Sequence, residues 1–181
     1  MPTVYLGLGA NMLMANGKAH SGGCVAKFSR EGGKFYGAGD VAKLDPLPDR
    51  PPEFAGKWWT RGMYWAYPGY DQQVALGGGN YPCLCASCRF DLDLYGRSFI
   101  PKAYQYTVGV VDTNGNVICE IGRYGNPESP AMKPGDTNIG IAECSYLATD
   151  SDRWLYINDE GNQRIVRIKL GYHAERKAGL Q

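Results

Sequence analysis

The chain begins with short apolar runs that polar and glycine-containing stretches separate. Residues 3–8 form one β-branched and aromatic run, and residues 24–36 form two more around the turn Glu31-Gly32-Gly33. Runs rich in β-branched and aromatic residues are typical of strands. A glycine-containing turn between two such runs is typical of a hairpin. The pattern therefore predicts short strands in residues 1–37 and gives poor support for helix.

Residues 38–87 interrupt this series of strand-like runs. Pro46, Pro48, Pro51 and Pro52 lie close together, and prolines at this density exclude both helix and central strand. A tryptophan-rich stretch, a run of glycines and a group of cysteines follow. Loops of this length are uncommon and are usually functional or held by other constraints. We expect a long irregular insertion here.

The remaining residues, 88–181, return to short strands and contain a repeat. Asp93 aligns with Asp150, Ile100 with Ile157, and Val108 with Ile165. A poorer third copy lies near residues 3–36. Repeats of about 40 to 45 residues built from four short strands are typical of β-propeller blades. We therefore predict an all-β chain with a degenerate blade in 1–37, the insertion in 38–87, and two blades with a C-terminal tail in 88–181.

Residues 155–168 resemble the core of an NHL repeat. They read Leu-Tyr-Ile-Asn-Asp-Glu-Gly-Asn-Gln-Arg-Ile-Val-Arg-Ile, in which Asp159, Asn162 and Arg164 occupy the polar positions of that family's signature. The resemblance extends over 89–126 and 139–170. It implies a β-propeller, usually six-bladed, that most often binds a ligand or a partner. About three NHL-like four-stranded repeats do not close such a ring. We therefore expect the C-terminal blades of a longer propeller or, alternatively, a chain that completes a ring or a stack by self-association.

The composition restricts the class of partner. The 181 residues include 19 Lys and Arg against 18 Asp and Glu, so the formal net charge is +1. Without a basic excess, nucleic acid and anionic membranes gain no electrostatic support. No apolar run approaches the roughly 20 residues of a transmembrane helix. We expect a protein partner, either a second copy or the rest of the propeller, with carbohydrate as a further candidate ligand.

The cysteines allow disulfides, a metal site or free thiols. Cys83, Cys85 and Cys88 share one short segment and, with Cys24 or His20 as a fourth donor, have the spacing to hold zinc or an iron–sulfur cluster. Structural zinc sites usually show a second matching pair, which this sequence lacks. The even count of 6 suits disulfides in an exported protein. We favour disulfides, no cofactor, and an extracellular or periplasmic location, with structural Zn or Ca as the alternative. The disulfide candidates are Cys24, Cys83, Cys85, Cys88, Cys119 and Cys144.

The aromatic stretch in the insertion is the candidate binding surface. Exposed rings form platforms for sugars or anchors at protein interfaces, although such rings also pack an insertion onto a sheet. The candidate ligand-binding residues are Trp58, Trp59, Tyr64, Trp65 and Tyr67.

Catalysis has weaker support in the sequence. The pairs Asp91 with Asp93 and Asp150 with Asp152 can bind calcium or act as acid and base, but aspartates at such turns more often bond local backbone N–H groups. No nucleophile elbow, zinc-protease motif, P-loop or dinucleotide fingerprint is present. We predict a non-enzymatic binding or assembly module. The alternatives are part of an extracytoplasmic propeller enzyme of the lyase or hydrolase type, and a structural subunit that polymerises through blade edges.

Overall fold

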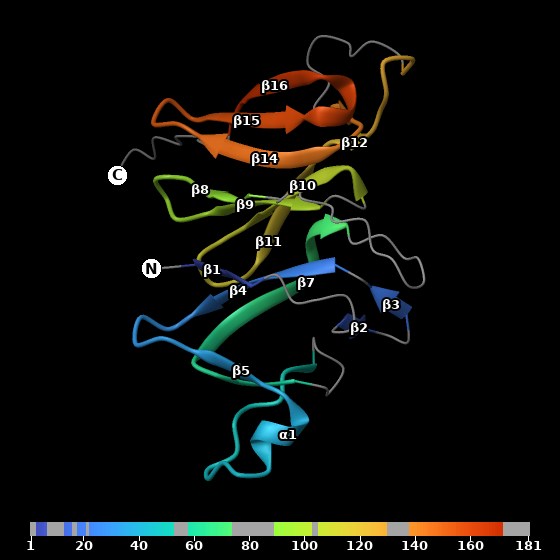
Figure 1. The fold of residues 1–181 in the computed structure, drawn as a ribbon. Coiled ribbons are helices and arrows are strands. Elements are labelled where there is room, and N and C mark those ends of the chain that lie inside the picture. Colours follow the sequence, from blue (N-terminus) through green and yellow to red (C-terminus); the bar gives the residue numbers. More distant parts are fainter. Residues whose placement is uncertain are drawn as a thin grey trace, which may run out of the picture.

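Three antiparallel β-sheets lie one above another in the computed structural model (Figure 1). The structure describes residues 3–6, 13–15, 18–20, 22–52, 58–73, 89–102, 105–129 and 138–171. We call the three sheets first, second and third in the order in which the chain forms them. Most described residues in regular structure are in strands, as the sequence predicts, and the described sheets do not close into a barrel.

The first sheet has the order β1 (Thr3–Leu6), β4 (Gly22–Phe28), β7 (Met63–Gln73). Beyond it, β5 (Lys34–Tyr36) pairs with β6 (Trp59–Arg61), and α1 (Ala38–Val41) follows β5. A separate pair, β2 (Leu13–Ala15) and β3 (Lys18–His20), lies between β1 and β4 in the chain.

The interval 38–87 differs from the irregular insertion that we expected. Residues 59–73 form β6 and the long strand β7, which pairs with β4 in the register Val25 with Tyr67 and Lys27 with Trp65. Aromatic residues pack well on a pleated surface, and this favours strand where the prolines end. The expectation was therefore wrong for 59–73, because a partner strand distant in sequence gives this segment its hydrogen bonds.

The second sheet is a meander of four strands that follow one another in space as in sequence. They are β8 (Asp91–Leu92), β9 (Ser98–Lys102), β10 (Thr107–Val111) and β11 (Val117–Ile121). Every residue of β9 and β10 is buried, whereas β11 is exposed along most of its length. The central strands are therefore covered on both faces, and β11 forms the outer edge.

The third sheet is also a meander, of β14 (Cys144–Thr149), β15 (Trp154–Asp159) and β16 (Arg164–Lys169). The 3-10 turn η3 (Glu160–Asn162) joins the last two strands. Buried and half-buried residues alternate along β15, which is the period of a strand with one face against the core. The short parallel pair β12 (Arg123–Tyr124) and β13 (Gly140–Ile141) links the second sheet to the third.

Apolar side chains fill the spaces between neighbouring sheets. The largest cluster joins the second and third sheets and includes Phe99, Val108, Leu155 and Ile157. A smaller cluster of Val25, Trp65, Ile100 and Val111 joins the first and second sheets. Another, around Ala26, Phe28 and Ala66, covers the opposite face of the first sheet. None of the described helices is long and apolar enough to cross a membrane.

Candidate functional site

The residues of the NHL-like signature converge on one buried carboxylate. The Asp159 side chain is fully buried at the end of β15. Its Oδ1 accepts hydrogen bonds from the backbone N–H groups of Ala142 at 2.9 Å and Glu143 at 3.2 Å. Its Oδ2 accepts bonds from Asn162 Nδ2 at 2.7 Å and Arg164 Nε at 2.9 Å. The signature residues therefore form one hydrogen-bonded network.

The same network ties the third sheet to the segment that precedes it. Asn162 also donates to the carbonyl of Gly125 at 2.9 Å, and Arg164 donates to the carbonyl of Gly140. Burial raises the pKa of Asp159, but the hydrogen bonds from Asn162, Ala142, Glu143 and Arg164 outweigh it and hold that pKa below its ordinary value. An ionised, fully bonded carboxylate stabilises the structure and has no free lone pair directed at a substrate.

The aromatic candidates have different environments. Trp58 packs against the cluster on the far face of the first sheet, and the ring of Trp59 lies 5.0 Å from the Arg50 guanidinium. Trp65 is 8% exposed and packs, with Tyr67, between the first and second sheets. Tyr64 is 58% exposed. The structure therefore does not gather the five rings into one platform.

Trp65 and Tyr67 instead contact the β10–β11 turn of the second sheet. Trp65 Nε1 lies 3.5 Å from the carbonyl oxygen of Thr113, and the Tyr67 hydroxyl donates to the carbonyl of Gly115. Gly115 has φ +91°, and a Cβ there would lie 2.7 Å from the Trp65 ring. Only glycine combines this backbone conformation with so close an approach.

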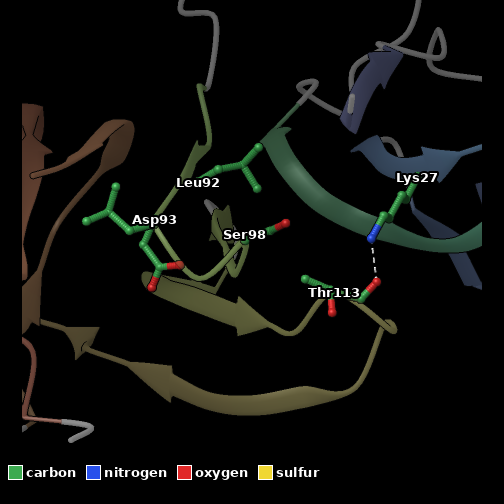
Figure 2. Close-up of a pocket in the computed structure, with 7 residues that line it drawn as sticks. Lys27, Leu92, Asp93, Ser98 and Thr113 are labelled. Carbon is green, nitrogen blue, oxygen red and sulfur yellow. Dashed lines mark hydrogen bonds between the residues drawn. The ribbon is translucent and has the colours of Figure 1, made fainter. Parts of the chain in front are cut away.

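A pocket of about 500 Å³ opens where this turn meets the first sheet. Figure 2 shows Lys27 on one wall, Leu92, Asp93 and Ser98 on the other, and Thr113 between them. A second pocket, of about 370 Å³, shares Lys27 and Thr113 and is also lined by Tyr64. Cavities of about 300 to 1,000 Å³ are typical of small-ligand sites. The pocket is therefore the strongest candidate binding site in the described part of the chain.

Lys27 and Ser98 were not among the residues that the sequence analysis selected. Lys27 is 6% exposed, and its ammonium donates to the carbonyl of Thr113. Ser98 is 1% exposed. The sequence marks Lys27 only as a charged residue within an otherwise apolar strand. That pattern does not reveal which sheet the lysine faces.

The paired aspartates serve mainly as turn and sheet connections. Asp93 accepts bonds from the N–H groups of Tyr95 and Arg97 and pairs with the Arg97 guanidinium. Asp150 accepts from Trp154 N at 2.9 Å, which lowers its pKa. Asp91 reaches the third sheet instead, where it accepts the Thr149 hydroxyl at 2.9 Å. Bonding of turn aspartates to local backbone, the alternative to catalysis, is thus confirmed for Asp93 and Asp150.

Two of the six candidate cysteines, Cys119 and Cys144, have described side chains. Cys119 is a free, exposed thiol on β11, so the expected disulfide is not found at this residue. Cys144 is buried in β14, and burial raises the pKa of its thiol to about 12. The side chains of Cys24 and His20, and Cys83, Cys85 and Cys88, lie outside the described residues. Within the described ranges, no three His, Cys, Asp or Glu side chains gather as a metal site would require.

Two comparisons with known proteins give no relative. No protein-family model matches the chain, and no curated protein matches it. The sheets, the buried network and the pocket are therefore the basis for assigning a function.

Proposed function

We propose that this chain forms consecutive blades of an NHL-like β-propeller and acts as a non-enzymatic binding module. Two features support the blade assignment. The second and third sheets are meanders whose strands follow chain order, and the three sheets stack through apolar clusters. Asp159, Asn162 and Arg164 also form a network that fixes one repeat to the preceding segment.

The observation that carries the binding function is the pocket of about 500 Å³ between the first and second sheets. Its walls come mainly from the β8–β9 and β10–β11 turns, which are loops on a rigid pair of sheets. Binding residues concentrate on loops held by such a scaffold. Of its two charged lining residues, Lys27 has no ion-pair partner among the described residues, whereas the Asp93 carboxylate is paired with Arg97. This composition suits recognition better than acid–base chemistry.

A fragment screen by NMR tests this function. We expect some neutral and charged fragments to shift the backbone amide signals of 92–98 and 112–116 saturably, while the fragments themselves stay unchanged after long incubation. Thr113→Tyr, which fills the pocket but keeps its backbone carbonyl, should abolish these shifts. Glu128→Tyr, which introduces the same side chain in another exposed turn, should preserve them. Fragment turnover, or shifts confined to other surfaces, would contradict the proposal.

Assembly with a second copy or with further blades is the second candidate function. The outer edge strand β11 exposes Val117 at 44% and Ile118 at 52%, and Ile165 on β16 is 72% exposed. Exposed apolar residues on an edge strand favour pairing with another chain. Light scattering after size exclusion should then give a molar mass that is a multiple of 19.8 kDa. Ile118→Lys should lower that molar mass. A monomer at all concentrations would exclude self-assembly.

The cellular location belongs to the same proposal. The exported, extracellular or periplasmic location rests on the cysteine content alone. Intact mass under non-reducing conditions tests it, because disulfides among the cysteines outside the described residues would each remove two hydrogens.

A further inference from the structure

Lys27 places a positive charge in the contact between two sheets. On β4, Val25 and Lys27 share one face, and Val25 belongs to the apolar cluster that joins the first and second sheets. The cross-strand neighbour of Lys27 is Trp65, a member of the same cluster. An apolar side chain would suit this position by the alternation of the strand. The lysine is instead 6% exposed and lines both pockets.

The charge on Lys27 lacks a carboxylate partner in the described part of the chain. The ion pairs there join Asp93 to Arg97, Glu120 to Lys102, and Asp159 to Arg164. The contact of Lys27 is with the Thr113 carbonyl, a neutral acceptor. An ammonium has three donors, and a buried charge is costly unless it is paired. An anion in the pocket would supply the missing charge and accept a remaining donor.

The other walls indicate what else such an anion would carry. The Ser98 hydroxyl points toward the Lys27 side of the pocket and provides a second donor (Figure 2). Leu92 and Leu94 also line the cavity and give it aliphatic surface. The Asp93 carboxylate is already neutralised by Arg97 at 2.7 Å. A ligand with one charged end and one aliphatic end therefore matches the pocket.

We propose that the pocket between the first and second sheets binds a small aliphatic carboxylate. Its carboxylate contacts Lys27 and Ser98, and its hydrocarbon lies against Leu92 and Leu94. The inference rests on the proposed binding function and adds the class of ligand.

Hexanoate and its neutral counterpart hexanamide test this inference on the full chain. Each is titrated at constant ionic strength, and amide shifts in 92–98 and 112–116 report binding. We expect hexanoate to bind at least about tenfold more tightly than hexanamide, because a hydrogen bond to a charged group is worth about one to two powers of ten in affinity. Lys27→Met should weaken hexanoate by a similar factor and leave hexanamide unchanged.

Lys102→Met is the matched control. Lys102 is also buried, at 7% exposure, but it lies on β9 and pairs with Glu120 outside the pocket. This variant should keep the affinity for hexanoate. If Lys27→Met does not fold, Ser98→Ala and the comparison of the two ligands on the unaltered protein decide the question.

The outcomes separate this inference from the binding function on which it rests. Equal affinity for hexanoate and hexanamide, or full affinity in Lys27→Met, would overturn the carboxylate site. If neither ligand binds but other fragments shift the same amides, the carboxylate inference fails and the binding function stands. If no fragment shifts them, both fail.

Discussion

Asp159→Asn tests whether the signature network holds the third sheet in place. The substitution keeps the size of the side chain and removes its charge. Asparagine can leave its carbonyl oxygen facing the N–H groups of Ala142 and Glu143. Its amide nitrogen then faces Asn162 Nδ2 and Arg164 Nε, which are also donors. Two hydrogen bonds are lost, and donors meet donors in a fully buried site.

The structure sets the expected size of the effect. A hydrogen bond to a charged group contributes about 1.5 to 3 kcal/mol. The Arg164 side chain is 48% exposed, so solvent screens its share, and we assign that bond less than about 1 kcal/mol. Adding the bond from Asn162 gives a loss of about 1.5 to 4 kcal/mol in the free energy of unfolding. This is a large fraction of the roughly 5 to 15 kcal/mol that stabilises a typical domain.

Urea unfolding followed by circular dichroism measures the loss. Asp152→Asn is the control, because it makes the same change of charge at an exposed turn residue, and it should leave the unfolding midpoint unchanged. A loss below about 1 kcal/mol in Asp159→Asn would refute the reasoning, since it is less than one charge-assisted hydrogen bond.

The pH dependence supplies a second readout of the same residue. Because the pKa of Asp159 is lowered in the folded protein, its carboxylate contributes stability above the unfolded pKa of about 3.9. That contribution is lost as the pH falls from there through the lower folded pKa. The difference in stability between the unaltered protein and Asp159→Asn should therefore be constant near neutral pH and shrink below about pH 4. An equal difference at pH 7 and about pH 3 would contradict this assignment.

Two further predictions concern the contact between sheets and the cysteines. Gly115→Ala should destabilise the chain by about 2 kcal/mol or more in urea unfolding, because its Cβ meets the Trp65 ring. Gly32→Ala has a similar positive φ, +99°, with nothing within 4 Å of the added Cβ, and should cost clearly less; equal losses would show that the Trp65 contact contributes nothing. In a native-state thiol assay, Cys119 should react faster than Cys144, because Cys119 is exposed whereas the Cys144 thiol is buried with a pKa of about 12. Cys119→Ser should therefore remove one of the reacting thiols, and Cys144→Ser should not. A fast-reacting Cys144 would show that β14 opens readily.

The sequence predicts local structure well where one strand follows another. Residues 88–170 alternate and turn at regular intervals, so the meanders of the second and third sheets follow from nearest neighbours in the chain. The polar pattern at 159, 162 and 164 likewise singles out residues that lie within one hairpin and bond to one another. Contacts between residues that lie close together in the chain can therefore be predicted from the sequence.

Strand pairing between segments far apart in the chain could not be predicted in the same way. The stretch 59–73 was expected to be irregular, yet β4 provides the partner that makes it a strand. The sequence equally allows Trp65 and Tyr67 to be exposed rings. In the structure, both contact the turn at 112–116. The pattern of a single strand does not specify which distant segment will cover each face.

The sequence by itself determined an all-β chain, its short strands and turns, and the polar signature of one repeat, because these depend on period and on neighbours within a few residues. Only the tertiary structure decided the candidate site. Lys27, Ser98 and Thr113 belong to β4, β9 and the β10–β11 turn, and the stacking of the first two sheets brings them to one pocket. That stacking depends on apolar burial, which is non-directional, so the sequence pattern marked which faces are buried but not which sheet covers them.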